Sequence, residues 1–211
     1  MLGLTTYLHR SGHQSVVAVD PRGALSARLS QQGLLTCPLR VRNHLDVFAG
    51  FRLRRLVRTG GYDIVHFHTA RAHALSPWLR GLPVKRLVTR RMDYPIQPGR
   101  MTRLLYEHSV DMVIAISHGV EAALHAGGIP PEHMRRIPSG IDTARFLSDV
   151  ARRQQMRTTL GIEPHEQMVL MIGALTERKG HGSLFSAATC SRSKGFDSVT
   201  LSAVKARCVQ T

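Results

Sequence analysis

The chain of 211 residues is long enough for one α/β domain of about 140 residues and part of a second. Its 43% apolar and 20% charged residues exclude a wholly disordered chain, a collagen-like repeat and a coiled coil. The 29 basic and 14 acidic residues give a net charge of +15, which fits a polyanionic partner such as nucleic acid, an anionic membrane surface or a phosphorylated sugar donor, although a compositional bias towards Arg explains the charge equally well.

Short apolar segments alternate with amphipathic helical patterns along most of the chain. The helical patterns lie at Leu2–Arg10, Ala24–Gln32, Leu45–Thr59, Arg71–Arg80, Arg100–Ser109 and His118–Ala126. We expect strands at Val16–Asp20, Leu35–Leu39, Asp63–His68, Arg86–Arg91, Asp111–Ser117 and Gln167–Ala174. This alternation predicts an α/β fold with a Rossmann-like, doubly wound parallel sheet.

The two ends interrupt the alternation. A helix at Leu2–Arg10 leads directly into the strand at Val16–Asp20, so we expect that a first strand and its Gly-rich turn are missing. The segment Thr189–Thr211 is rich in Ser, Thr, Lys and Arg, and we expect it to be disordered. We therefore predict a first domain at residues 1–140, the start of a second at 141–188 and a tail at 189–211.

No apolar run approaches the roughly 18–20 residues that span a bilayer, and the chain does not begin with a secretory signal pattern. We expect a cytoplasmic protein, with peripheral contact to the inner face of the cell membrane as an option. Cys37, Cys190 and Cys208 are widely spaced and form no CxxC motif, so we expect free thiols.

Five segments, taken in order, resemble motifs of family 4 glycosyltransferases of the GT-B type. The motifs are Ser11-Gly12-His13 before a Val-rich strand, Tyr62-Asp63-Ile64-Val65-His66-Phe67-His68, Ala115-Ile116-Ser117, Ile137-Pro138-Ser139-Gly140-Ile141-Asp142 and Ile172-Gly173-Ala174-Leu175-Thr176-Glu177-Arg178-Lys179-Gly180. The resemblance implies an acceptor-side domain followed by the start of a donor-side domain. It also implies transfer of a sugar from a nucleotide-sugar donor to a lipid-linked or saccharide acceptor, with no other cofactor and no metal.

The chain departs from the family pattern at several positions. Ser139 stands where members usually have Asn, and Ala174 stands where they have Arg. The segment Thr89-Arg90-Arg91-Met92-Asp93-Tyr94-Pro95 resembles a subgroup with Arg-Arg-x-Asp that is linked to lipopolysaccharide sugar transfer. The Glu-x7-Glu pair that holds the donor ribose in the family does not occur, so we expect these 211 residues to be inactive on their own.

The resemblance and the residue chemistry together give the candidate site. Arg178 and Lys179 precede a helix start, where fixed cations and free backbone N–H groups can bind the donor phosphates. Asp93 follows a strand end and can act as a base or orient the acceptor hydroxyl, and Arg90 and Arg91 can hold an acidic acceptor group. The alternatives are a turn-capping Asp and solvated arginines.

His66 and His68 alternate on one strand and therefore share a face. We weigh a place near the acceptor against a structural role, and no third ligand supports a metal site. Two other functions stay open: a non-enzymatic remnant of a glycosyltransferase gene, and a basic nucleic-acid-binding module. Only 11 aromatic residues and no recognisable nucleic-acid motif make the latter the weaker alternative, and we expect no nucleic acid partner.

Overall fold

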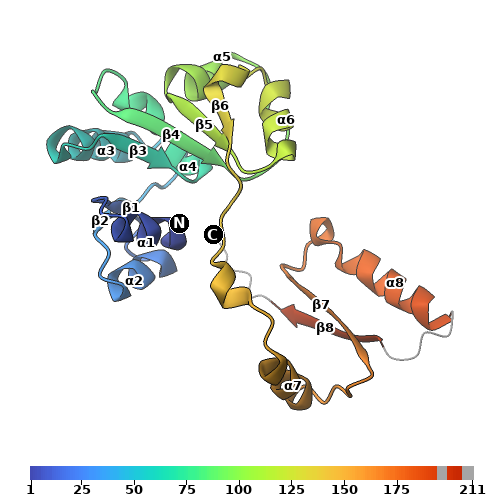
Figure 1. Ribbon diagram of the computed structural model, residues 1–211. Helices are drawn as coiled ribbons and strands as arrows, with labels where there is room; N and C mark the ends of the chain where they lie inside the picture. Colours follow the sequence, from blue (N-terminus) through green and yellow to red (C-terminus); the bar gives the residue numbers. More distant parts are fainter. Residues whose placement is uncertain (194–198, 206–211) are drawn as a thin grey trace. The chain divides into compact units, whose positions relative to one another are not determined.

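The computed structural model describes residues 1–193 and 199–205 (Figure 1). They divide into two compact units, unit 1 (Met1–Ile141) and unit 2 (Asp142–Thr211). Every strand pairing in both units is parallel, and helices connect the strands. The α/β class expected from the sequence is therefore confirmed.

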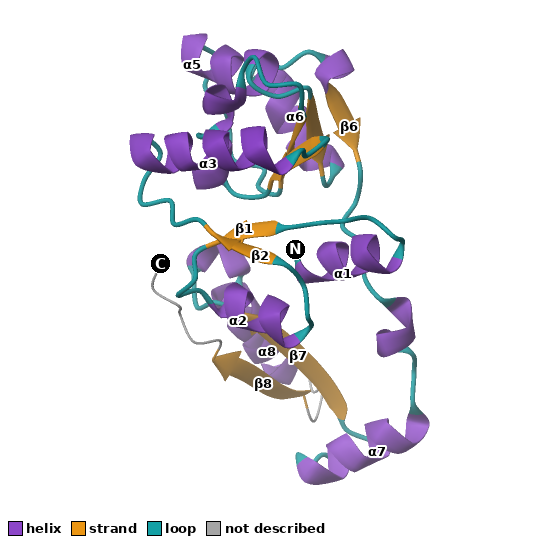
Figure 2. Ribbon diagram, turned by 90° about the vertical axis from the view of Figure 1, so that its left-hand side faces the viewer, coloured by secondary structure: helices purple, strands orange, loops and turns teal. Residues whose placement is uncertain are grey.

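Unit 1 contains two parallel sheets. The smaller pairs β1 (Val17–Val19) with β2 (Thr36–Pro38). The larger has the order β3-β4-β5-β6, with strands at Ile64–Phe67, Lys85–Arg90, Met112–Ala115 and Met134–Arg136. The helices of this unit are α1 (Leu2–Arg10), α2 (Ala24–Gln31), α3 (Val47–Gly60), α4 (Ala70–His73), α5 (Arg100–Arg103), α6 (His118–Ala126), the 3-10 turns η1 (Ser76–Leu79) and η3 (Pro131–His133), and the π-helical turn η2 (Leu104–His108) (Figure 2).

One hydrophobic core joins the larger sheet to its helices. Val113 and Ala115 alternate along β5 and are fully buried, as β-strand geometry requires of residues on one face. Leu53 of α3 and Leu124 of α6 belong to the same cluster. These helices therefore fix the position of the strand ends, where the candidate site lies.

Helix α3 packs closely against the segment that follows β3. Asp46 caps its first turn by accepting a hydrogen bond from the backbone N–H of Ala49 at 3.0 Å. A Cβ at Gly50 would lie 2.5 Å from the ring of Trp78, so only glycine permits this approach. Gly61 ends the helix at φ +62°.

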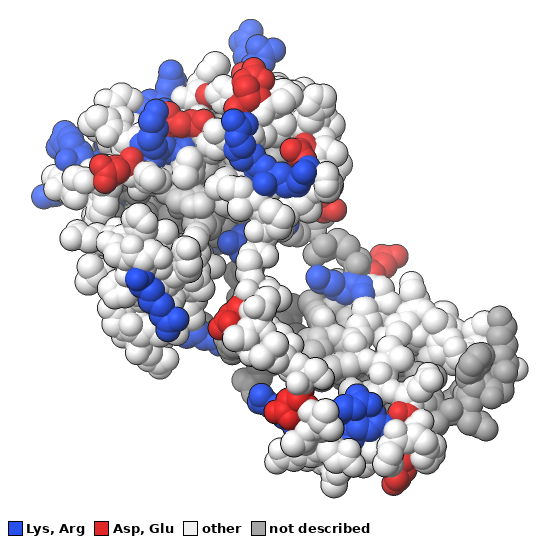
Figure 3. All heavy atoms as spheres, in the orientation of Figure 1, with Lys and Arg blue, Asp and Glu red and all other residues white. Residues whose placement is uncertain are grey.

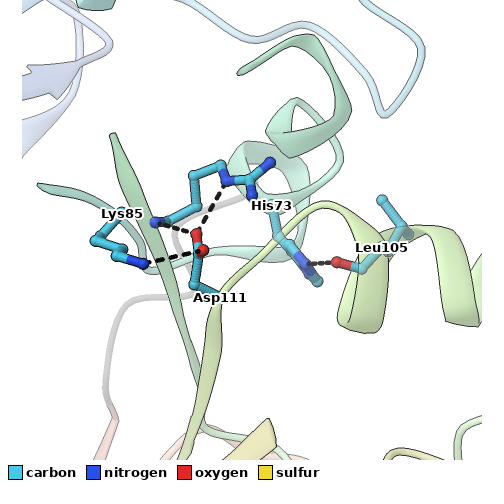
Figure 4. A network of polar contacts seen from close by, with 5 residues as sticks. His73, Lys85, Leu105 and Asp111 are labelled. Carbon is cyan, nitrogen blue, oxygen red and sulfur yellow. Dashed lines mark hydrogen bonds and ion pairs between the residues drawn. The ribbon is translucent and has the colours of Figure 1, made fainter. Parts of the chain in front are cut away.

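Asp111 ties the beginnings of β4 and β5 together (Figure 4). Its carboxylate accepts hydrogen bonds from the backbone N–H and the Nε of Arg86, at 2.8 and 3.0 Å, and lies 3.9 Å from Lys85 Nζ. Partial burial opposes ionisation, but the hydrogen bonds from Arg86 outweigh it and lower the pKa of Asp111. The contact between Arg86 and Asp111 therefore fixes the register of β4 and β5 at the amino edge of the sheet.

Unit 2 is built around a single βαβ arrangement. Its elements are η4 (Thr143–Phe146), α7 (Val150–Thr159), β7 (Gln167–Gly173), η5 (Glu177–Lys179), α8 (His181–Ser193) and β8 (Val199–Lys205). Strand β8 pairs in parallel with β7. Arg157 is buried and donates hydrogen bonds to the backbone carbonyls of Glu163 and Glu166, which closes the turn between α7 and β7.

The structure differs from the sequence-based elements in four places. The helix expected at Arg71–Arg80 is split into α4 and η1, because Pro77 cannot donate a helical hydrogen bond. The helix expected at Arg100–Ser109 changes to π geometry in η2. Strand β6 is absent from the prediction, because only Met134 of its three residues is buried.

The tail is the fourth difference. The sequence predicts disorder for Thr189–Thr211, yet α8 continues to Ser193 and Val199–Lys205 forms β8. The β-branched Val199, Thr200 and Val204 suit a strand, and β8 pairs in parallel with β7 over its whole length. The remainder of the predicted tail, residues 194–198 and 206–211, lies outside the described residues. Within residues 1–193 and 199–205, no helix is both long and apolar enough to cross a membrane.

Candidate functional site

The carboxyl ends of β3 and β4 bring most of the predicted acceptor-side residues together. His66 lies in β3 beside Leu87 of β4, and His68 follows directly after the strand. Arg90 ends β4, and Arg91 is the next residue. Loops at the carboxyl ends of parallel strands line the functional edge of α/β sheets, so this placement agrees with a site.

His66 and His68 form a stacked pair. Their ring centroids lie 3.9 Å apart with the planes tilted by 37°. Nε2 of His66 forms a hydrogen bond of 2.7 Å with Thr89 Oγ1, which fixes the ring across the β3–β4 pair. Nδ1 of His68 is buried and has no hydrogen-bond partner among the described residues.

Both imidazoles are strongly disfavoured from taking a proton. Burial, followed by the charge of Arg91, lowers the pKa of His66 from 6.5 to about 4. Burial, followed by His66 and Arg91, lowers the pKa of His68 to about 3. The α-amino group of Met1 has its pKa lowered in the same way, by burial and then by Arg91. All the charges that act on these groups are positive, so we call His66, His68 and Arg91 the electropositive cluster.

Arg91 is the exposed member of this cluster. It forms no hydrogen bond or ion pair with another described residue, so its guanidinium is free to bind an anionic ligand. Arg90 behaves differently. It donates hydrogen bonds to Tyr106 Oη at 3.1 Å and to the backbone carbonyl of Tyr94 at 2.6 Å. Arg90 therefore holds the loop that carries Asp93.

His73 and Tyr106 support this loop and are not among the residues that the sequence singles out. The His73 ring is buried and meets the Tyr106 ring edge to face, at a centroid distance of 4.6 Å. Its Nε2 donates a hydrogen bond of 3.0 Å to the carbonyl of Leu105 in η2 (Figure 4). Burial lowers the pKa of His73 to about 4, so the ring is neutral at neutral pH. The π-helical turn, which sequence periodicity does not reveal, directs Tyr106 towards Arg90.

Asp93 lies in the exposed loop after β4, near the first turn of α6. A Cβ at Gly119 would lie 3.9 Å from the Cβ of Asp93, and Ser117 caps this turn through its hydrogen bond to the N–H of Val120. Asp93 forms no hydrogen bond or ion pair with another described residue. Its carboxylate is therefore accessible at the same edge as Arg91, as a base or an orienting group must be.

The predicted phosphate-binding residues lie in unit 2, between β7 and α8. Lys179 is exposed at the end of η5, and Gly180 takes the left-handed conformation at φ +74° before α8 begins. The side chain of Arg178 lies outside the described part of the structure. The N–H groups of the first turn of α8 and the Lys179 ammonium together resemble an anion-binding arrangement.

His181 is a further residue of this turn that the sequence does not single out. It is buried in the first turn of α8, and its Nε2 donates a hydrogen bond of 3.0 Å to the carbonyl of Ala174. Its Nδ1 is buried and has no partner among the residues that the structure describes. The hydrogen bond between His181 and Ala174 fixes the loop between β7 and α8. In the sequence, the predicted start of a helix is the one signal that could have pointed to His181.

Metal ligation finds no support in the described residues, where no three His, Cys, Asp or Glu side chains form a group that could hold an ion.

The comparison that decides the family concerns the sequence. Residues 1–145 match the domain described as Glycosyltransferase Family 4, which is more than half of the chain. The chain belongs to glycosyltransferase family 4. The family domain contains the whole electropositive cluster and Asp93, whereas Lys179 lies beyond it.

Solved structures show the fold of this family 4 chain. Anabaena Alr3699/HepE in complex with UDP and glucose is similar with a TM-score of 0.73 and 15% identity, over 97% of this chain and 65% of that one. HepE in complex with UDP-glucose has a TM-score of 0.72 and 18% identity, over 94% of this chain and 54% of that one. MurG from Acinetobacter baumannii has a TM-score of 0.50 and 13% identity, over 96% of this chain and 61% of that one. At these identities the likeness establishes the GT-B, Rossmann-like fold, and the chain spans less than two thirds of each structure. Among curated proteins, no sequence matches it.

Proposed function

We propose that this family 4 chain takes part in transferring a sugar from a nucleotide-sugar donor to an acceptor hydroxyl. Unit 1 recognises the acceptor and unit 2 binds the donor phosphates. The observation that carries the proposal is the electropositive cluster beside the accessible Asp93, within the family domain. The UDP and UDP-glucose complexes of HepE support the choice of donor class.

The chemistry assigns a separate role to each group. The bond between the anomeric carbon and the donor diphosphate breaks, and the diphosphate leaves with the bonding electrons. The acceptor oxygen forms a new bond to that carbon, and Asp93 takes the proton of the acceptor hydroxyl. Lys179 and the N-terminus of α8 stabilise the charge that develops on the diphosphate.

The electropositive cluster favours an acceptor with a negatively charged group. His66 and His68 are neutral at neutral pH and offer hydrogen bonds, while Arg91 supplies a full positive charge. A lipid-linked or anionic saccharide acceptor of the cell envelope fits this chemistry. The Arg90-Arg91-Met92-Asp93 segment supports placing the chain with lipopolysaccharide-type transferases.

Titration with nucleotide sugars tests the donor side. We expect UDP and UDP-glucose to bind the chain, and Lys179→Ala to weaken binding at least tenfold, because a charged hydrogen bond contributes about 1.5–3 kcal/mol. Arg153→Ala is the matched control, since Arg153 is an exposed cation on α7 of the same unit. Equal affinities of the two variants would contradict the assignment of Lys179.

We also propose that the 211 residues alone release no free nucleotide in the presence of lipid-linked acceptors. The sequence contains no Glu-x7-Glu pair to hold the donor ribose. A nucleotide-release assay with UDP-glucose checks this. Measurable turnover by the chain would contradict the proposal.

A further inference from the structure

His181 lies between two glycines at the start of α8, and its imidazole is turned into the interior of unit 2. Its side chain is 7% exposed. The backbone on either side is open, because a Cβ at Gly180 or Gly182 would meet no atom of another segment within 4 Å. The first N–H groups of a helix have no intrahelical partner. The turn therefore leaves these N–H groups accessible and buries one polar ring beneath them.

One hydrogen bond defines the position of this ring. Nε2 of His181 lies 3.0 Å from the carbonyl oxygen of Ala174. A carbonyl oxygen only accepts hydrogen bonds, so Nε2 carries a hydrogen atom and donates it. Nδ1 is buried and has no hydrogen-bond partner among the described residues. The imidazole therefore acts on its surroundings through Nε2.

The carbonyl of Ala174 connects His181 to Lys179. It also accepts a hydrogen bond of 2.8 Å from the N–H of Thr176, and the carbonyl of Thr176 accepts one of 3.0 Å from the N–H of Lys179. The end of β7 lies beside both side chains, because a Cβ at Gly173 would be 3.7 Å from His181 Nε2 and 3.7 Å from Lys179 Cγ. His181 thus holds the loop from Ala174 to Lys179 against the start of α8.

An anion site at this turn depends on local geometry rather than on a wide positive surface. Ala174 supplies no charge, and the exposed Lys179 supplies one. On the face of unit 2 that Figure 3 shows, the described Lys and Arg side chains lie apart from one another and form no patch. A phosphate group would be held where the Lys179 ammonium and the N–H groups of α8 converge on it.

We infer that His181 is a positioning residue for the donor, because its hydrogen bond to Ala174 sets Lys179 and the first turn of α8 in the arrangement that receives the diphosphate of a nucleotide sugar. This step rests on the proposed binding of the donor by unit 2. His181 acts through the loop and does not touch the donor. Its replacement should therefore weaken recognition of phosphate and leave recognition of the nucleoside unchanged.

Titration of the full chain with UDP and with uridine separates these two kinds of recognition. We expect the wild type to bind UDP about a hundredfold more tightly than uridine, because several charged hydrogen bonds hold the diphosphate. His181→Leu should lower this preference to about tenfold. His181→Gln should keep it within about threefold of the wild type, because the amide N–H of Gln can replace the Nε2–H group.

The matched control is His165→Leu, the same change at an exposed histidine of unit 2. It should resemble the wild type in both titrations. Amide hydrogen exchange without any ligand gives a second measurement. The N–H groups of Thr176 and Lys179 should exchange faster in His181→Leu and at the wild-type rate in the control. Circular dichroism checks that every variant is folded.

Each outcome of these measurements bears on the role of His181. An unchanged preference for UDP in His181→Leu, unchanged exchange at Thr176 and Lys179, or a preference in His181→Gln as low as in His181→Leu would overturn the inference and leave the proposed donor binding intact. Equal weakening of UDP and uridine would overturn it too, because His181 would then only stabilise unit 2. A wild type that does not prefer UDP to uridine would overturn the proposed donor binding, and this inference with it.

Discussion

Unit 1 and unit 2 both use parallel strands, but their strands have very different surroundings. In β5 of unit 1, Val113 and Ala115 are completely buried. In β7 of unit 2, Met168, Leu170 and Ile172 are 38%, 48% and 69% exposed. A parallel strand is normally covered on both faces, so the described part of unit 2 depends more on backbone pairing with β8 and on the buried Arg157.

The contrast extends to the candidate site. In unit 1, side chains from neighbouring elements contact one another. The His73 ring packs on Tyr106 of η2, and Arg90 of β4 donates a hydrogen bond to Tyr106 Oη. In unit 2, Lys179 projects from a single turn. Preorganised groups are therefore concentrated in unit 1, which makes this unit the more sensitive to single substitutions.

The largest expected effect concerns core packing. Leu124→Ala in α6 should destabilise unit 1 by about 2–5 kcal/mol, because Leu124 is fully buried. Leu170→Ala in β7 is the matched change and should cost under about 1 kcal/mol, because that side chain is half exposed. Urea denaturation with hydrogen exchange of peptides from each unit measures both. Equal losses would remove the distinction between the units.

Asp93→Asn should lower turnover about a hundredfold in an enzyme completed with the donor-side domain of an active family 4 glycosyltransferase. The amide keeps the shape of the side chain but cannot take the acceptor proton. Asp63→Asn is the control, because Asp63 is exposed just before β3 begins, at the opposite edge of the sheet. Unchanged turnover of the Asp93 variant would contradict a catalytic role and favour the alternative of a turn-capping Asp.

Arg157→Gln should destabilise unit 2 locally, by about 1–3 kcal/mol, because two backbone carbonyls lose a charged donor. Hydrogen exchange in residues 160–170 should accelerate, while exchange in β5 stays as in the wild type. Slow exchange in both regions would show that unit 2 does not depend on Arg157.

Acid should weaken unit 1 through its histidines. The pKa values of His66 and His68 in the folded chain, about 4 and about 3, lie below 6.5, so the unfolded chain binds more protons between about pH 3 and 6.5. Stability is therefore lost as the pH falls through this window. Thermal melting at pH 7 and pH 5 should show a smaller loss for His66→Gln/His68→Gln than for the wild type, with His73 contributing the remainder. The same loss in both proteins would contradict the lowered pKa values.

The sequence predicts the parts of the fold that local chemistry determines. Helix α6 is predicted within its observed bounds, because Ser117 marks its start and the apolar spacing continues to Ala126. Strand β6 and the π-helical turn have no local signal, since tertiary packing decides both. The same limit applies to the site. Strand ends identify His66, His68 and Arg91, but the contacts of Tyr106 and His73 depend on segments that meet only in the folded chain.

The division of labour between the units can be measured directly by hydrogen exchange of the chain with and without UDP-glucose. We expect protection at residues 173–184, where Lys179 and the start of α8 lie, and no change at residues 64–68 of unit 1. An anionic acceptor analogue such as a polyprenyl phosphate should protect residues 64–68 and leave residues 173–184 unchanged. Protection of residues 64–68 by UDP-glucose, with none at residues 173–184, would contradict the assignment of acceptor and donor recognition to units 1 and 2.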